Sequence, residues 1–526
     1  MRTQFLRALT TLLGVAAIAA VGGCDDDIVY RDRPPFNEPA DPASGFVGYY
    51  AAAESRTTCG NCHADFQAGW EETAHAHAWQ TLADIDAPAS CYSCHTITER
   101  GNVATGVVGH DKVQDETYYD VQCESCHGPG LEHIEAVSQG QLVRPLANIG
   151  IGPDTSAGCA ACHNGSHHPF VEQWAVSRHA IVDDHMAPNP SCQKCHEGRG
   201  ALARWDAGTN YAEKGEATSY QAITCSVCHD PHGSSNPAQL RLSVADPDPS
   251  ANLCMSCHLY RTEPSAGSSR ANQPHGPQGA VLLGFAGWRP PNFVYDTARI
   301  YGSHATTANP NLCAGCHVNR FTVTDQVTGD FVFQSTGHQF EAIPCVDDQG
   351  VPTGEDDCAF TADARNWSAC TNAGCHVGGA GVAANVFNSA RDLIIDLQNV
   401  LWADTDADQT IDPSPTDQGY LPLILTNTTD LNPSDNEISA ADGSEFNVRL
   451  CGIGLHGHPD GSFGTHNSFL CRALLLQSAA YLESIYGFLP APPPAVKAMM
   501  DKWSQSVQTG SNRPIIRREA FPSIDR

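Results

Sequence analysis

A Cys-x-x-Cys-His motif that recurs along most of the sequence constrains this chain more than any other feature. One copy lies in the stretch Val121–His133, which reads VQCESCHGPGLEH. This motif is the attachment signature of c-type haem: two thiols bond the porphyrin, and the adjacent histidine is the proximal ligand of the iron. The Gly-Pro-Gly turn sends the chain back, which places His133 to ligate a haem iron from its other side.

Nine copies occur, numbered here motif 1 to motif 9 in chain order, and only motif 9 (CTNAGCH) has four residues between its cysteines. Zinc sites and redox-active dithiols also use Cys-x-x-Cys, but neither needs a histidine directly after the second cysteine. The predicted haem-bonding cysteines are Cys59 and Cys62, Cys91 and Cys94, Cys123 and Cys126, Cys159 and Cys162, Cys192 and Cys195, Cys225 and Cys228, Cys254 and Cys257, Cys313 and Cys316, and Cys370 and Cys375. The predicted proximal ligands are His63, His95, His127, His163, His196, His229, His258, His317 and His376. We therefore expect about nine haems c.

The composition indicates what such a chain folds into. Only 41% of the residues are hydrophobic, and 46 glycines and 34 prolines are present. The first seven motifs begin about 29 to 36 residues apart, and segments this short hardly bury a core of their own. We expect a mainly α fold with short helices, extensive irregular loops and little β structure, in which the haems serve as the core.

The N-terminus has the features of an export signal. Two arginines precede the apolar run Ala8–Val21, which is too short to span a bilayer, and Val21-Gly22-Gly23-Cys24 resembles a bacterial lipobox. We predict a signal peptide over 1–23 and lipidation of Cys24, with ordinary secretory cleavage as the alternative. The protein would then be exported and anchored by lipid to a bacterial membrane, facing the periplasm or the cell surface.

Further boundaries follow from the motifs and the composition. Residues 24–45 read as a flexible tether, 46–265 as a region with seven motifs, and 266–380 as a region with two more. Residues 381–487 read as a C-terminal helical region, and 488–526 as a Pro-rich, loosely ordered tail.

The net charge is −30, which argues against nucleic acid as a partner and favours, more weakly, basic redox partners. The other predicted partners are cytochromes and quinol-linked or outer-membrane electron-transfer components, with the membrane reached through the lipid anchor.

Four cysteines lie outside the motifs and the lipobox, and in an oxidising compartment they allow three pairings. We favour the pairs close in sequence, Cys345–Cys358 and Cys451–Cys471; free buried thiols are the alternative.

The C-terminal region has apolar residues at helical spacing over Val386–Trp402, and a second helix is expected over Asn467–Tyr486. Between them, the sequence DTDADQTID resembles a calcium loop, although Gln409 replaces the usual glycine and Pro415 the final glutamate. A solvated acidic loop is the equal alternative. The predicted calcium ligands are Asp404, Asp406, Asp408, Asp412 and the Thr410 carbonyl.

Several elements together resemble the multihaem cytochrome c superfamily, which includes tetrahaem carriers, pentahaem nitrite reductases and octahaem oxidoreductases. These are the pattern W-x-x-S/T-x-H-A at Trp70–Ala76 and Trp174–Ala180, the sequence CESCHGPG, and the final helix that follows His466-Asn467. The resemblance covers roughly Thr57–Gly487. It implies that the distal haem ligands are His75, His133, His168, His179, His232, His275, His304, His338 and His466. The substitute candidates, which would take a distal position if one of these residues does not, are His77, His110, His167, His185, His456 and His458. Methionine is scarce, so we expect bis-histidine ligation and low potentials.

Three functions remain open from the sequence. The first is electron transfer through about nine haems in respiratory or extracellular electron transfer, and the second is a multihaem oxidoreductase that acts on a small nitrogen or sulfur compound at one open haem. The third is a subunit of a cytochrome filament. Nitrite reductases of the superfamily commonly mark their open haem with Cys-x-x-Cys-Lys, and that motif is absent here. We therefore favour an electron-transfer protein over an enzyme, with no catalytic residue assigned.

Overall fold

The structure is a computed structural model. It describes residues 44–148, 158–205, 220–267, 273–291, 293, 303–372, 375–432, 434–452 and 460–509. The chain divides into two units, 1–40 and 41–526, and every described residue belongs to the second. The predicted signal peptide, the lipidated Cys24 and nearly all of the tether lie outside the described residues, as do His456 and His458.

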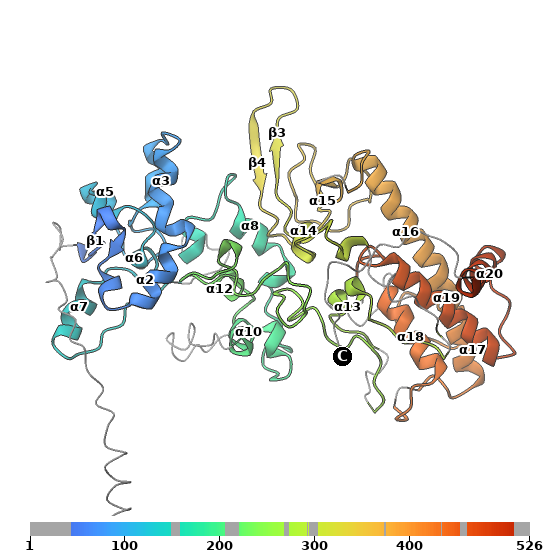
Figure 1. The fold of residues 1–526 in the computed structure, drawn as a ribbon. Coiled ribbons are helices and arrows are strands. Elements are labelled where there is room, and N and C mark those ends of the chain that lie inside the picture. The colour runs from blue at the N-terminus through green and yellow to red at the C-terminus, as the bar shows by residue number, and fades with distance from the viewer. Residues whose placement is uncertain are drawn as a thin grey trace, which may run out of the picture. The chain divides into compact units, whose positions relative to one another are not determined.

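Residues 44–267 form short helices joined by irregular loops, as the motif spacing predicts (Figure 1). The strands and α-helices are β1 (Tyr49–Ala51), β2 (Arg56–Thr57), α2 (Ala64–Glu71), α3 (Ala78–Ala83), α4 (Tyr92–His95), α5 (His110–Val113), α6 (Cys123–His127), α7 (Leu131–Ser138), α8 (Phe170–Ala175), α9 (Gln193–His196), α10 (Gly198–Arg204) and α12 (Cys225–Cys228). The 3-10 helices are η2 (Ala52–Glu54), η3 (Cys59–Asn61), η4 (Ala74–His77), η5 (Ala89–Cys91), η6 (Glu116–Tyr118), η7 (Gly158–Ala161), η8 (Arg178–Ala180) and η9 (Pro237–Gln239).

The following segment adds a β-hairpin, yellow in Figure 1, between motif 8 and motif 9. Its antiparallel strands place Phe321 opposite Ser335 and Val323 opposite Phe333. The elements are α13 (Gln278–Leu283), η11 (Ser303–Ala305), α14 (Cys313–His317), β3 (Phe321–Thr324), β4 (Phe331–Ser335) and α15 (Ser368–Thr371). The mainly helical fold with little strand is confirmed.

The C-terminal region contains longer helices: α16 (Ala380–Leu401), α17 (Tyr420–Asn427), α18 (Ala440–Cys451), α19 (Ser468–Ile485) and α20 (Pro494–Thr509). The two predicted helices correspond to α16, which starts six residues earlier than expected, and to α19. The prediction of a loosely ordered tail is wrong for the residues of α20, because Val496 and Met500 of this helix pack into the core. Pro494 suits the first position of a helix because the N–H it lacks has no intrahelical partner there.

The apolar side chains are distributed unevenly. The C-terminal helices share one large hydrophobic core, to which α18 and α19 contribute Phe446, Leu450, Leu474 and Leu475. In the described residues before 260, the buried clusters are small, such as Phe46 with Ile97 and Tyr118. The motif-bearing region therefore buries few apolar side chains of its own, as expected if haems serve as its core, whereas the C-terminal region has a core of apolar side chains. Among the described residues, no helix is sufficiently long and apolar to cross a bilayer.

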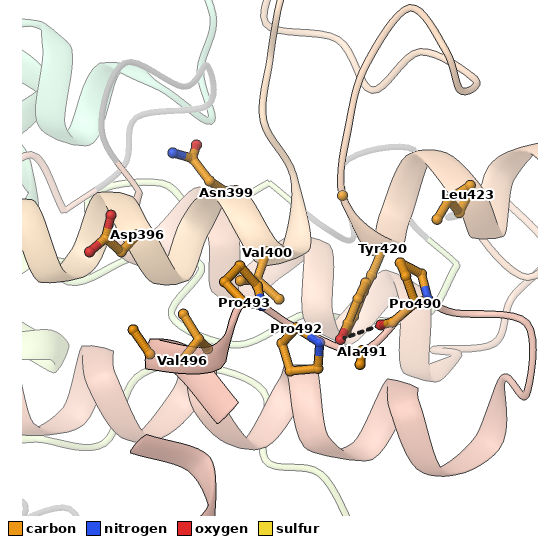
Figure 2. A pocket seen from close by; sticks show the side chains of 12 residues that line it. Asp396, Asn399, Val400, Tyr420, Leu423, Pro490, Ala491, Pro492, Pro493 and Val496 are labelled. Carbon is orange, nitrogen blue, oxygen red and sulfur yellow. Dashed lines mark hydrogen bonds between the residues drawn. The ribbon is translucent and has the colours of Figure 1, made fainter. Parts of the chain in front are cut away.

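The Pro-rich segment before α20 borders a cavity of about 390 Å³ beside α16 and α17 (Figure 2). The Tyr420 hydroxyl donates a hydrogen bond to the Pro490 carbonyl at 3.1 Å, which attaches the segment to α17. No histidine or cysteine lines this cavity, so it is separate from the haem motifs.

The four cysteines outside the motifs and the lipobox form two pairs, and only one of these pairs is a disulfide in the structure. Cys345 and Cys358 form a disulfide, with Cα atoms 6.0 Å apart. Cys451 and Cys471, the other predicted pair, lie next to each other as two buried thiols in hydrogen-bond contact. Packing of α18 against α19 brings these thiols together, and the bond between them stays a prediction.

Candidate functional site: the haem motifs and their histidine pairs

The haem motifs fold locally as single helical turns. In motifs 1, 4, 5, 6 and 7, the backbone N–H of the histidine donates to the carbonyl of the first cysteine, four residues earlier, at 2.8–3.0 Å. Residues i, i+3 and i+4 of a helix share one face, so the turn presents both thiols and the imidazole on the same side. In motif 9 the backbone N–H of His376 instead donates to the carbonyl of Cys370, six residues earlier, at 3.1 Å. This bond accommodates the two extra residues between the cysteines.

Eight of the nine predicted proximal histidines face a predicted distal histidine from a remote part of the chain. The ring centres of these pairs lie 5.9–6.4 Å apart. The pairs are His63–His133, His127–His232, His163–His75, His196–His275, His229–His338, His258–His179, His317–His466 and His376–His304.

This separation fits a metal ion held between two imidazoles. An imidazole nitrogen binds a metal at about 2.0–2.1 Å and the ring centre lies roughly 1.1 Å further out, which gives about 6.3 Å between opposed ring centres. The donor sets therefore fit haem iron. His133, which follows motif 3, is paired with His63 of motif 1, while His127 of motif 3 is paired with His232.

Motif 2 differs from the others. Within the described residues, the His95 ring forms no ring pair of this kind with another imidazole. The pKa of His168 is lowered by burial first and then by His167 and His95, which places His168 in the vicinity of His95. Its role as the distal ligand of motif 2 stays a prediction.

The described substitutes lie elsewhere. His110 is buried among the aromatic rings of Trp79, Tyr92 and Tyr119, and His167 stacks on Phe331 with ring centres 4.2 Å apart. Neither faces a motif histidine at the ligand-pair separation. His77 and His185 also form no such pair among the described residues.

Hydrogen bonds at Nδ1 orient many of these rings. A backbone carbonyl that accepts from Nδ1 leaves Nε2 as the nitrogen free to bind a metal. The bonds join His95 to Ala78, His127 to Pro145, His133 to Val143, His229 to Ala238, His304 to Thr465, His317 to Phe340 and His338 to Thr336, at 2.5–3.2 Å. Burial also lowers the pKa of His163, His179, His317 and His338 to about 4. Burial thus favours the neutral imidazole that metal binding requires, and the Nδ1 bond fixes which of the two nitrogens carries the proton.

Cysteines from different motifs touch one another. Direct thiol contacts are Cys59–Cys123, Cys94–Cys162, Cys159–Cys225, Cys195–Cys257 and Cys254–Cys313. The pKa values of Cys162 and Cys254 are raised first by their thiol contacts and then by burial, and the pKa of Cys316 is raised first by burial. At each of the three, the charge of a cysteine in a further motif raises the pKa as well. Cys162 is affected in this way by Cys126, Cys254 by Cys228 and Cys316 by Cys370. A cysteine bonded to haem does not titrate, so these interactions indicate proximity alone.

The first six motifs form two structural repeats offset by about 100 residues. The Trp70 indole donates to the Val121 carbonyl and the Trp174 indole to the Ile223 carbonyl, each at 2.9 Å. The backbone N–H of each of these two residues donates in turn to the backbone carbonyl of the histidine in the W-x-x-S/T-x-H-A pattern. Val121 donates to His75 and Ile223 to His179, each at 3.1 Å. Motifs 1 to 3 therefore correspond to motifs 4 to 6.

Three phenylalanines lie between histidines that belong to different ring pairs, and sequence reasoning did not single them out. Phe66 lies 4.8 Å from His232 and 6.2 Å from His63, and Phe170 lies 4.8 Å from His338 and 5.4 Å from His163. The two occupy equivalent places in the repeats, each four residues before the tryptophan, which is a signal the sequence contained. Phe340 has a similar place, 4.5 Å from His179 and 5.7 Å from His338.

Two family models match parts of the chain. "Doubled CXXCH motif" matches residues 219–261, which contain motifs 6 and 7, and "Cytochrome c554 and c-prime" matches 58–128, which contain motifs 1 to 3. The chain is a multihaem c-type cytochrome. Its haem c groups are bonded through the Cys-x-x-Cys-His motifs.

Curated relatives resemble the cytochrome over about a third of its length. The multiheme cytochrome MtrA of Shewanella baltica is 27% identical over 194 residues, which are 33% of this chain and 54% of the relative. The C-type polyheme cytochrome OmcB of Geobacter sulfurreducens is 28% identical over 196 residues, which are 32% of this chain and 25% of the relative. OmcC of the same species is 25% identical over 210 residues, which are 33% of this chain and 26% of the relative. The chain thus spans about half or less of these relatives, and no solved structure matches the cytochrome.

The carboxylate of Glu124, between the cysteines of motif 3, is a structural residue that sequence reasoning missed. It accepts backbone hydrogen bonds from Val47 at 3.0 Å and from Gly48 and Gly130 at 2.7 Å. Burial raises the pKa of Glu124 to about 7, although these bonds act to lower it. The side chain thus ties the first described segment of the cytochrome to the Gly-Pro-Gly turn.

The acidic loop of the cytochrome brings together the carboxylates predicted to bind calcium. Oxygens of Asp406, Asp408 and Asp412 lie within 4.8 Å of one another. Oxygens of Asp404, Asp406 and the buried Asp417 also lie within 4.8 Å of one another. The sequence reasoning did not include Asp417. The core residue Trp402 holds Asp417 by a 2.8 Å hydrogen bond from its indole. Asp417 supplies a carboxylate that Pro415 cannot, and calcium binding stays a prediction.

Proposed function

We propose that this cytochrome is an electron-transfer protein that holds nine haems c, eight of them between the paired histidines described above. The single observation that carries the proposal is the set of eight ring pairs at 5.9–6.4 Å. Haem iron with two protein ligands supplies one-electron redox chemistry. The ninth haem is assigned to His95 with His168 as its distal ligand.

The contacts between cysteines support an order for the attachment sites. Motifs 1, 3, 4, 6, 7, 8 and 9 form one continuous series, in which each motif approaches the next. Motif 2 joins this series at motif 4, and motif 5 joins it at motif 7. The side positions of motifs 2 and 5 agree with the internal repeat, in which they are equivalent.

The relatives support the wider setting of the proposal. They are multiheme and polyheme cytochromes by name. We assign the chain to respiratory or extracellular electron transfer, with other redox proteins as its partners. Lipidation at Cys24 would hold it to a bacterial membrane, facing the periplasm or the cell surface.

The oxidoreductase alternative has one observation in its favour. Motif 2 is the only motif whose histidine has no ring-pair partner within the described residues. An enzyme of this class needs one iron position open to substrate.

Electron paramagnetic resonance of the oxidised protein separates the two functions, because an open haem gives a high-spin ferric signal that nitrite or hydroxylamine converts to low spin. Electron transfer with full ligation predicts low-spin signals alone, nine haems by pyridine haemochrome, and no turnover of nitrite, hydroxylamine or tetrathionate.

The series of motifs is tested by deleting one attachment site at a time. Cys225→Ala with Cys228→Ala removes the haem of motif 6, within the series, and Cys192→Ala with Cys195→Ala removes that of motif 5, beside it. Each variant should retain eight haems and the far-ultraviolet circular dichroism of the parent. The current through molecules attached to two electrodes by terminal tags should fall in the motif 6 variant and persist in the motif 5 variant. Equal currents in the two variants would refute the proposed series.

A further inference from the structure

The hydrogen bond at Nδ1 of His466 differs from those of the other described ligand histidines. Seven rings donate to neutral backbone carbonyls. His466 instead donates to a carboxylate, Oδ1 of Asp460, at 2.6 Å. A bond to a charged acceptor is stronger than one to a neutral carbonyl.

Asp460 is held rigidly and lies away from solvent. Its side chain is 2% exposed, and the Ser462 hydroxyl donates to its other oxygen, Oδ2. The same hydroxyl accepts the backbone N–H of His466 at 3.1 Å, so Ser462 fixes both partners. In the part of the chain that the structure describes, His466 is the only basic residue whose side chain pairs with this carboxylate.

A second carboxylate near a predicted ligand shows what is special about Asp460. Oδ1 of Asp230 lies 3.7 Å from Nδ1 of His232, which is too long for a hydrogen bond. Its other oxygen accepts a 2.7 Å bond from Arg241, which balances its charge. Asp230 is therefore a matched control for Asp460.

A carboxylate that accepts the Nδ1 proton raises the basicity of the imidazole as a metal ligand. The stronger donor, together with the nearby buried negative charge, favours ferric over ferrous iron, and second-sphere hydrogen bonding is a recognised determinant of haem potential. Resting on the ligation proposed above, we infer that Asp460 acts through His466 to lower the reduction potential of the haem at motif 8, making it the lowest in the C-terminal part of the series.

The test is a spectroelectrochemical titration of the full holoprotein with Asp460→Asn, with Asp230→Asn as control. The amide of Asp460→Asn keeps the shape and an acceptor oxygen but removes the charge. The midpoint potential of one one-electron component should become more positive by about 59 mV. This shift corresponds to about a tenfold rise in the ferrous-to-ferric ratio of that haem at a fixed potential. The control should leave the motif 8 component in place, because Asp230 pairs with Arg241 and not with His466. Asp460→Glu, which restores a carboxylate, should return that component toward its original potential.

His466→Ala identifies the component and keeps the two proposals distinguishable. If this variant retains every low-spin haem, His466 is not a ligand and the proposed ligation of motif 8 fails. If it produces one high-spin haem while Asp460→Asn leaves all potentials unchanged, the ligation stands and the role of Asp460 is refuted. A high-spin haem in Asp460→Asn itself would also refute this role, because Asp460 would then be needed to keep the ligand in place.

Discussion

The backbone oxygen of Thr465 accepts a hydrogen bond from Nδ1 of His304 at 2.6 Å, although the two residues are 161 positions apart. The next residue, His466, faces His317 with ring centres 6.0 Å apart. One short loop before α19 thus orients a predicted ligand of motif 9 and supplies one for motif 8. The helical C-terminal region thus contributes directly to the histidine pairs of motifs 8 and 9.

The stability of this loop should depend on Asn467, which caps α19. Its buried side chain accepts the Leu470 N–H at 3.0 Å, so Asn467→Ala should destabilise the region by about 0.5–2 kcal/mol. Calorimetry should show a lower melting temperature for the C-terminal transition, while Ser468→Ala, next in sequence, should have little effect. An unchanged transition in Asn467→Ala would contradict the capping role.

The pairing of ligands can be tested by combining variants. His75 follows motif 1 in sequence but faces His163 of motif 4. His75→Ala should therefore produce one high-spin haem in the complete protein and none in a variant that lacks the motif 4 haem through Cys159→Ala and Cys162→Ala. His133→Ala, whose predicted partner is His63, should produce a high-spin haem in both backgrounds. Paramagnetic resonance measures each case, and an effect of His75→Ala that persists without motif 4 would refute the pairing.

The buried carboxylate of Glu124 gives a pH-dependent prediction. Glu124→Gln leaves a backbone donor without its acceptor, which should cost roughly 1–3 kcal/mol. Because the pKa of Glu124 in the folded protein is raised to about 7 from 4.5, its contribution to stability is full below pH 4.5 and is lost as the pH rises through about 7. The difference in melting temperature between the parent and Glu124→Gln should shrink over that range. Exposed Glu135→Gln is the control, and a difference independent of pH would contradict the raised pKa.

The acidic loop should make the stability of the C-terminal region depend on calcium. Burial and four neighbouring aspartates raise the pKa of Asp412, and a divalent cation would relieve their repulsion. A cation bound only to the folded state stabilises it by mass action, so chelation should lower the melting temperature. Asp404→Ala with Asp406→Ala should abolish this sensitivity. If neither treatment changes the transition, the segment is a solvated acidic loop.

The lipid anchor predicts a change in cellular fractionation. Cys24→Ser removes the acylated thiol and leaves the polar sequence Asp25-Asp26-Asp27 after it. The variant should move from the membrane fraction to a soluble one with its haem content unchanged. Continued membrane association would refute lipidation as the means of attachment.

The sequence by itself determined the cofactor chemistry and the local form of each site. A thiol at i, a thiol at i+3 and an imidazole at i+4 fit within one helical turn, so the motif can be read without knowledge of the fold. The helices α16 and α19 were also readable, because their apolar residues recur at helical spacing. The histidines that face the motif histidines were recognisable as a set through the superfamily resemblance.

Only the tertiary structure decided which histidine faces which motif. The turn after motif 3 suggests that His133 returns toward an iron, yet its ring faces His63 of motif 1. Such pairings join segments far apart in sequence, and no local spacing encodes them. The same holds for Glu124, whose partners include the distant Val47, and for Asp417, which Trp402 holds beside the acidic loop. The sequence also did not reveal the large C-terminal core, because the composition averaged over the whole chain combines one apolar region with a longer region that buries few apolar side chains of its own.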